Sequence, residues 1–403
     1  MKKTGIERLL TEKNLRAALH GKRIALVAHP ASVDQQLMHS LDRLLQIADW
    51  RVSSAFSPQH GMRGEKQDNM VESDSYIDPH YGLPVFSLYG EVRRPTQAMM
   101  DTFDVLLFDL QDIGCRIYTY VTTLLYMMQA CAECGKAIWI LDRPNPAGRP
   151  LDGLLLKDNF FSFVGAAPML LRHGMTMGEM ASWYKRHFHL DVDLQVIPME
   201  GYDPTAGPGY GWPLGERSWV NPSPNAANLS MARCFAGTVM LEGTHLSEGR
   251  GTTRPLEVVG HPQIAFDQVH RKMRELCQNW LVGCTLREIY FEPTFHKHAG
   301  LLCHGLQIHV DDRFYGHEQF RPFLLMSLVF KAIRACYPDF VLWRDFHYEY
   351  ERDRLAIDLI TGSDILRKWV DDPSAEPQDL ECLVESDVAI WREELREVAL
   401  YPL

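Results

Sequence analysis

Short aliphatic runs alternate with helical patterns along the first half of the chain. Five of these runs are β-branched or aliphatic, end at polar residues, and are typical of buried strands: 22–28, 50–56, 83–88, 104–110 and 137–141. A helical pattern covers 5–19, and a clearer one covers 117–134, where apolar side chains share one face and Gly135 stands at the C-terminal cap position. Strands that alternate with helices predict an α/β fold with a parallel sheet.

The pattern changes in the second half. Residues 201–225 are rich in Gly, Pro, Trp and Asn and have no periodicity, which indicates a long ordered loop or a crossing between domains. We therefore expect a first domain over 1–230 and a second over 231–403. Strands are predicted at 306–310 and 355–360, and helices at 266–280, 320–336 and 380–398, which suggests a smaller α/β domain.

Polar loops follow three of the predicted strands. In an open parallel sheet, ligands bind beyond the carboxyl ends of the strands, so these loops are the first place to search for a site. The candidates are Gln59 and His60 after the second strand, Asp109, Gln111 and Asp112 after the fourth, and Asp142, Arg143 and Asn145 after the fifth. The three loops are expected to converge on one edge of the sheet. For the aspartates and Arg143, ion pairing that anchors the loops is an equal alternative.

The amino-acid composition and net charge indicate which class of protein this is. The chain has 403 residues, 46% hydrophobic and 23% charged, which is typical of a compact globular protein with two or three domains. Its net charge of -11 argues against non-specific binding of nucleic acid or anionic lipid.

The number of cysteines and the N-terminal sequence indicate the cellular compartment in which the protein is expected. An odd number of cysteines, nine, scattered over a long chain favours a reducing compartment, and we expect a cytoplasmic protein. The first ten residues, MKKTGIERLL, lack the apolar stretch of a signal peptide. The most apolar runs, such as 322–333, fall short of the roughly 20 residues that span a bilayer, so we expect no membrane anchor.

Common cofactor motifs are missing. The loop after the first strand reads AHPASVD and has no glycine, so NAD or FAD binding is not expected, and P-loop, GxSxG and HExxH patterns are also absent. Cys131 and Cys134 form a CxxC at the end of a helix with no second pair, which favours core packing over zinc. A cluster around Cys303 (His296, His298, His304 and His309) is a possible metal site, although structural or substrate-contacting roles are favoured. We expect no cofactor and no metal.

The segment 242–254, EGTHLSEGRGTTR, combines carboxylates, hydroxyls, glycines and arginines between two apolar flanks. A solvated loop is one interpretation. A glycine-rich loop held between buried elements more often carries function, so Glu242, Glu248 and Arg250 are candidates for binding or catalysis.

Several longer strings now allow a comparison with a known family. They are FSPQHGMRGE (56–65), PVFSLYG (84–90), DVLLFDLQDIGCRIYTY (104–120), LDRPNP (141–146), RHGMTMGE (172–179), NPSPN (221–225) and EGTHLSEGRGTTRP (242–255). Together they resemble the exo-β-N-acetylmuramidase (NamZ-like) family over about 21–310, and more weakly to the end of the chain. The resemblance implies a Rossmann-like domain with the catalytic pocket and an auxiliary domain that shapes the cleft. It also implies a bacterial glycoside hydrolase that releases N-acetylmuramic acid from the non-reducing end of peptidoglycan fragments, with a glycan as its partner and no nucleotide.

One position departs from the family pattern. Many family members have glutamate in a Pro-Glu-His-Gly motif, whereas this chain has Gln59, which cannot donate or accept a catalytic proton. We expect Glu65, in the same loop, to supply the missing carboxyl, with His60 and Asp112 as further catalytic residues. Glu72 and Asp74 are the alternatives.

The substrate-binding residues are expected in the same motifs. They are Gln59, Arg63, Asp109, Gln111, Arg116, Tyr118, Asp142, Arg143, Asn145, Glu242, Glu248 and Arg250. A lactyl carboxylate distinguishes N-acetylmuramic acid from N-acetylglucosamine, and an arginine matches it with two hydrogen bonds. At least one of Arg63, Arg116, Arg143 and Arg250 should bind it.

Glycosidic cleavage needs a proton donor and stabilisation of a positively charged transition state, usually by two carboxylates, or by the substrate's own acetamido group. Two other functions stay open at this point. The chain could be a sugar-binding or sensing protein without activity, or a metal-dependent hydrolase that uses Asp112, His60 and the C-terminal histidines.

Overall fold

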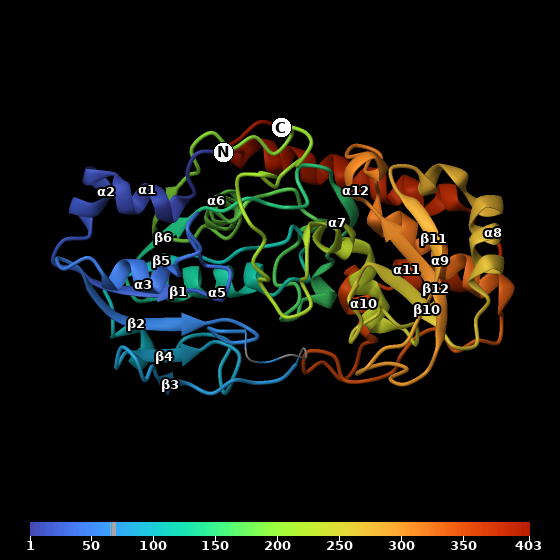
Figure 1. Ribbon diagram of the computed structural model, residues 1–403, viewed down its shortest axis with the longest axis horizontal. Coiled ribbons are helices and arrows are strands. Elements are labelled where there is room, and N and C mark those ends of the chain that lie inside the picture. The colour runs from blue at the N-terminus through green and yellow to red at the C-terminus, as the bar shows by residue number, and fades with distance from the viewer. Residues whose placement is uncertain (65, 67–69) are drawn as a thin grey trace.

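The computed structural model describes residues 1–64, 66 and 70–403, and Glu65 lies outside this part. In Figure 1 the strands of a large sheet occupy the left half of the molecule and a small sheet occupies the right half. The two chain termini lie close together at the top.

The large sheet has seven strands in the order β3-β4-β2-β1-β5-β6-β9. All neighbouring pairs are parallel except β3 with β4. The bounds are β1 Arg23–Val27, β2 Arg51–Ser57, β3 Tyr76–Ile77, β4 Pro84–Ser87, β5 Val105–Phe108, β6 Ala137–Leu141 and β9 Asp193–Ile197. The chain builds outward from β1 in one direction through β2 and β4, then returns to the other side of β1 with β5. A reversal of this kind leaves a crevice at the carboxyl ends of the strands beside it.

Helices cover both faces of this sheet. Their bounds are α1 Gly5–Thr11, α2 Lys13–Ala18, α3 Ser40–Leu45, α4 Gln97–Met100, α5 Tyr120–Glu133 and α6 Met177–His187. On one face, α1 and α3 pack through side chains such as Leu9 and Leu41, and on the other α5 and α6 pack against β6. The predicted single helix over 5–19 is wrong in one respect, because Glu12 has an extended backbone and divides it into α1 and α2.

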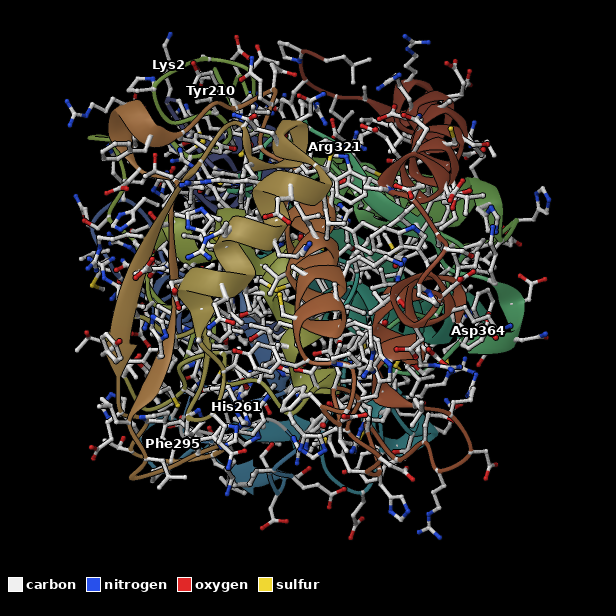
Figure 2. The ribbon with its side chains drawn as sticks, turned by 90° about the vertical axis from the view of Figure 1, so that its right-hand side faces the viewer. Lys2, Tyr210, His261, Phe295, Arg321 and Asp364 are labelled. Carbon is white, nitrogen blue, oxygen red and sulfur yellow. The ribbon has the colours of Figure 1, made fainter. Side chains whose placement is uncertain are left out.

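The second half contains a small antiparallel sheet, in the order β10-β12-β11, packed against helices. Its elements are α7 Leu229–Thr238, β10 Val258–His261, α8 Phe266–Leu276, β11 Thr285–Phe291, β12 Cys303–His309, α9 Pro322–Cys336, α10 Ala356–Thr361, α11 Ile365–Asp371 and α12 Pro377–Val398. A two-stranded sheet of β7 Asp152–Leu155 and β8 Leu170–Arg172 lies between β6 and β9 of the large sheet in sequence. Figure 2 looks onto the second half, with Arg321 near the start of α9 and Asp364 just before α11.

The strand predicted at 355–360 is wrong, because these residues form helix α10. The run is buried throughout, and a short apolar run that is buried on all sides does not show whether its period is that of a strand or of a helix. Gly362, in the left-handed conformation at φ 87°, ends the helix.

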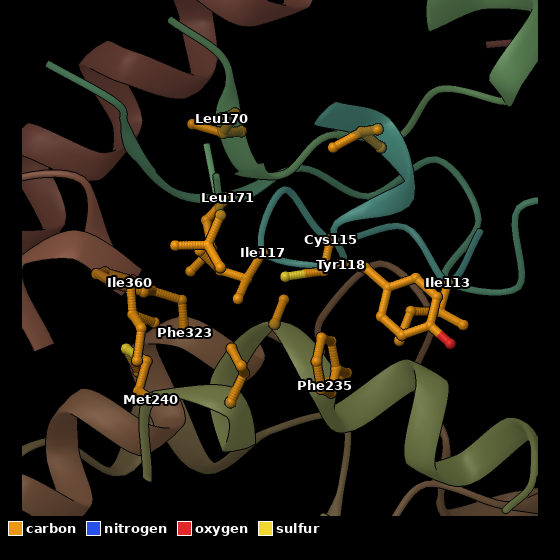
Figure 3. Packing of buried hydrophobic residues seen from close by; sticks show 14 of the residues in the cluster. Ile113, Cys115, Ile117, Tyr118, Leu170, Leu171, Phe235, Met240, Phe323 and Ile360 are labelled. Atoms are coloured by element: carbon orange, nitrogen blue, oxygen red, sulfur yellow. The ribbon is translucent and has the colours of Figure 1, made fainter. Parts of the chain in front are cut away.

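One hydrophobic core joins the two halves. In Figure 3, Ile117 and Tyr118 from the loop before α5 face Phe235 of α7 and Met240 of the following 3₁₀ helix. Helix α12 packs against β7 and α6 and so carries the end of the chain back to the first half (Figure 1). None of the described helices is both long and apolar enough to cross a membrane.

Candidate active site

A pocket lies where the crevice of the large sheet meets the second half of the chain. It contains about 550 Å³ of empty space, counted out to its open mouth. The first half contributes the loop after β2, the loop before α5 with the start of that helix, Val164, and the segment before α7, and the second half contributes α7, the 3₁₀ helix that follows it, and two loops. The lining residues are Gln59, His60, Ile117, Tyr118, Thr119, Tyr120, Val164, Ser223, Asn225, Met231, Phe235, Val239, Glu242, Arg250, Leu256, Tyr348 and Glu349.

Gln59 enters the pocket directly after β2 and is buried. Its Oε1 accepts a hydrogen bond of 2.8 Å from the Thr119 hydroxyl, and its Nε2 lies 3.4 Å from Oε1 of Glu349 and donates to it. His60 follows with a left-handed backbone at φ 72°, and its Nδ1 lies 2.8 Å from the carbonyl oxygen of Lys66. Gln59 therefore connects the first half of the chain to a carboxyl group from the second half.

Glu349 lies 5% exposed in a tight turn between Tyr348 and Glu351. Its Oε2 accepts a hydrogen bond of 2.7 Å from the Tyr89 hydroxyl. Burial raises the pKa of Glu349 to about 7, the neighbouring charge of Glu242 adds to the rise, and the hydrogen bond from Tyr89 opposes it. This carboxyl group can exchange a proton near neutral pH.

Glu242 is the second buried carboxyl group of the pocket, and the 3₁₀ helix Val239–Gly243 positions it. Its Oε1 accepts a hydrogen bond of 2.5 Å from Nη2 of Arg250, and its Oε2 accepts one of 2.8 Å from the Tyr348 hydroxyl. A guanidinium partner favours the ionised form of a carboxyl group. The pocket thus combines one carboxyl group with neutral hydrogen-bond donors and one paired with a cation.

Aromatic side chains form one wall of the pocket. The Tyr118 ring packs edge-on against Tyr120, with ring centroids 4.6 Å apart, and against Phe235 at 5.8 Å. The Tyr120 hydroxyl donates to the carbonyl oxygen of Pro222, which fixes the NPSPN loop over the pocket. Such a wall suits the apolar face of a sugar ring.

Comparison with known proteins identifies the family. The model of the N-terminal part of the exo-β-N-acetylmuramidase NamZ matches residues 24–230, and the model of its C-terminal part matches residues 233–401. The chain belongs to the exo-β-N-acetylmuramidase NamZ family.

Relatives and solved structures agree with this assignment. The chain is 40% identical over 343 residues to the peptidoglycan β-N-acetylmuramidase NamZ of Bacillus subtilis (strain 168), which is 83% of this chain and 78% of that protein. A crystal structure of a DUF1343 family protein from Bacteroides fragilis NCTC 9343 is similar with a TM-score of 0.84 and 28% identity, and covers 99% of both chains. A second from the same organism has a TM-score of 0.74 and 28% identity, and covers 99% of this chain and 98% of that one.

Five of the residues expected from the sequence line the pocket of this NamZ-family chain: Gln59, His60, Tyr118, Glu242 and Arg250. Glu248 lies just behind them, where it contacts Nε of Arg250 at 3.0 Å and Nζ of Lys297 at 2.8 Å. Burial would raise the pKa of Glu248, but Lys297, His296 and Arg250 hold it well below its usual value.

Other expected residues hold the polar loops together. Arg143 forms two hydrogen bonds to Asp109, of 2.7 and 2.8 Å, and both side chains are buried. Asp142 accepts hydrogen bonds from Thr176, Gly178 and Tyr401, and burial raises its pKa to about 6. In these places the structure shows the ion-paired and hydrogen-bonded anchors that the sequence left as an alternative.

The amides and Arg116 also contact protein groups. Gln111 donates to the carbonyl oxygens of Asp112 and Pro144, and Asn145 donates to that of Met175. Arg116 donates to three carbonyl oxygens, of Leu154, Met169 and Ile360, and burial lowers its pKa to about 10. These side chains join segments of the fold, and among the described residues they are not part of the pocket lining.

Two further expected residues lie outside the lining. Oδ2 of Asp112 accepts a hydrogen bond from the backbone N–H of Gly114 and lies 3.2 Å from Nε2 of His173. Arg63 is 63% exposed and contacts Asp78 at 3.0 Å. Glu65, the expected proton donor, lies outside the described residues.

The possible metal-binding residues are dispersed. His296 contacts Glu248, whereas the ring of His304 stacks on Tyr290 with centroids 4.6 Å apart. Across residues 1–64, 66 and 70–403, no three or more His, Cys, Asp or Glu side chains lie together in a way that could hold a metal ion. Cys131 is buried in α5 and Cys134 follows at its end, and both are free.

Proposed function

We propose that this chain is an exo-acting glycoside hydrolase that releases N-acetylmuramic acid from the non-reducing end of peptidoglycan fragments. The observation that carries the proposal is the pocket between the two halves, in which two differently paired carboxyl groups lie together with the loops that follow β2 and β5. The name of the 40% identical Bacillus subtilis relative supports the same substrate class.

The pocket supplies what glycosidic cleavage requires. A proton must reach the leaving oxygen, and positive charge that develops on the sugar must be stabilised. Glu349 can supply a proton near neutral pH, and Glu242 is held in place by the hydrogen bond from Arg250. If the acetamido carbonyl of the substrate attacks the anomeric carbon, one protein acid is sufficient and the other carboxylate orients the substrate.

Arg250 is our candidate for recognition of the lactyl carboxylate. Of the four arginines that the sequence nominated, Arg250 is the one that lines the pocket. Its guanidinium contacts Glu242 and Glu248 and is 5% exposed, so its orientation is fixed before the substrate arrives. A pre-oriented guanidinium binds a carboxylate with little further loss of side-chain entropy.

The proposal includes a cytoplasmic location and muramyl glycans as partners. All nine cysteines are free, which suits a reducing compartment. An enzyme in that compartment would act on fragments released from the cell wall, in recycling.

The test is incubation of the purified protein with a β-linked disaccharide of N-acetylmuramic acid and N-acetylglucosamine, in the presence of a metal chelator, with both sugars quantified by mass spectrometry. We expect equal amounts of the two monosaccharides. Tight binding of the disaccharide without release of either sugar would contradict the proposal and would indicate a sugar-binding protein.

A further inference from the structure

Glu349 lies in a strained turn that aims its side chain into the pocket. Glu349 and Tyr350 both have left-handed backbones, at φ 46° and φ 71°, although neither is glycine. Two hydrogen bonds between the backbones of Tyr348 and Glu351 close the turn. Such conformations cost free energy and persist where the surrounding structure holds them in place.

Contacts from the first half of the chain hold the turn. The backbone N–H of Glu349 contacts Sδ of Met70 at 3.3 Å, and the Tyr350 hydroxyl donates to Glu72 at 2.7 Å. Tyr348 and Glu349 both line the pocket, whereas Tyr350 is exposed. The turn therefore places a carboxyl group from the second half directly against the sheet edge of the first.

The partners of Glu349 distinguish it from the other carboxyl groups of the site. Within the described part of the chain, the side chains that hydrogen-bond to it are Tyr89 and Gln59, both neutral, and Arg93 acts on it through its charge. Glu242 and Glu248 each contact the guanidinium of Arg250.

Resting on the proposed function, we propose that Glu349 is the proton donor to the leaving sugar, and that Gln59 and Tyr89 are positioning residues that hold its carboxyl group. In the reaction, the bond between the anomeric carbon and the glycosidic oxygen breaks and its electron pair stays on that oxygen. The oxygen takes the proton of Glu349 and leaves as a hydroxyl group. Water then supplies the hydroxyl group of the anomeric carbon and the proton that restores Glu349.

This assignment gives Gln59 a defined role. An amide can donate to a carboxyl oxygen and accept from a hydroxyl group at the same time, and Gln59 does both, toward Glu349 and Thr119. A second acid at this position would couple its titration to that of Glu349. With glutamine, a single proton resides on Glu349.

The experiment compares E349Q with E351Q, a matched variant in the same turn whose glutamate pairs with Arg354 away from the pocket lining. Each is assayed on the natural disaccharide and on a dinitrophenyl β-glycoside of N-acetylmuramic acid, whose leaving group needs no proton. We expect E349Q to lose about 10²- to 10⁴-fold in kcat/KM on the disaccharide, the usual contribution of general acid catalysis, and less than tenfold on the dinitrophenyl substrate. E351Q should keep wild-type rates on both.

Three outcomes would overturn the assignment. The first is an equal loss of E349Q activity on the two substrates, which a structural role would give. The second is near wild-type activity of E349Q on the disaccharide. The third is that E65Q, rather than E349Q, loses activity selectively on the disaccharide. Melting temperatures of the variants show whether each is folded. An inactive wild-type protein would count against the proposed function, whereas an active wild type with an active E349Q counts against Glu349 alone.

Discussion

The chemistry of the pocket depends on how its individual carboxyl groups are paired. Glu349 is buried beside neutral donors, whereas Glu242 is buried beside a guanidinium, and they belong to one pocket. Environments that separate the protonation of two acids assign one to proton transfer and the other to a fixed charge. The contrast rests on single hydrogen bonds, so it can be tested by removing them one at a time.

Removing the Tyr89 hydroxyl should change the pH dependence of activity. Wild-type activity should fall as the pH rises through about 7, because the reaction needs protonated Glu349. The Tyr89 hydrogen bond stabilises the ionised form, so Y89F should raise the pKa of Glu349 and move the alkaline limb of kcat/KM up by roughly 0.5 to 1 pH unit. Y81F, which removes a tyrosine hydroxyl from Asp42 away from the pocket lining, is the control and should leave the limb in place. A limb that stays or moves down in Y89F would contradict this account.

Replacing Arg250 should affect one sugar more than the other. R250K keeps a positive charge beside Glu242 and Glu248 but loses the planar pair of donors. We expect kcat/KM to fall by about 10- to 150-fold more on a muramyl glycoside than on the matching glucosaminyl glycoside, which corresponds to hydrogen bonds to a charged group. R254K, in the same segment but half-exposed and paired with Glu257, serves as the control. Equal losses on both sugars would show that Arg250 does not recognise the lactyl group.

At the scale of helices and strands, the local sequence pattern predicted those elements whose structure depends on interactions between neighbouring residues. Five of the seven strands of the large sheet and helix α5 follow from hydrophobic runs and a glycine cap, and the structure confirms them, whereas β3 and β9 were not predicted. Helix α10 was missed because a fully buried run of six residues carries no visible period. The break at Glu12 depends on one extended residue, which the periodicity over 5–19 does not reveal.

The sequence predicted only part of the site. Residues in the loops after the strands were found because the fold class says where to look, and Gln59, His60 and Tyr118 do line the pocket. Glu349 was missed because it lies 290 residues from Gln59 in sequence, in a turn whose YEYE pattern resembles an exposed strand. For Asp109 and Arg143 the sequence left ligand binding and ion pairing as equal alternatives, and the structure shows the two residues in a bidentate pair.

The whole molecule encloses its site between two halves. The loops that follow β2 and β5 supply one wall, and α7 with Glu242, Arg250, Tyr348 and Glu349 supplies the other. The shared core around Ile117 and Phe235 and the return of α12 to the first half join these walls (Figures 1 and 3). The proposed exo-action requires that this pocket receive the end of a glycan chain.

Exo-action from this pocket is the central claim, and it is tested most directly by digesting two tetrasaccharides of identical composition. One begins at its non-reducing end with N-acetylmuramic acid and the other with N-acetylglucosamine, and the products are followed by mass spectrometry. The account predicts that the first loses a single N-acetylmuramic acid, leaving a trisaccharide, and that the second is unchanged. Disaccharides formed from either substrate at early times would show internal cleavage and would contradict it.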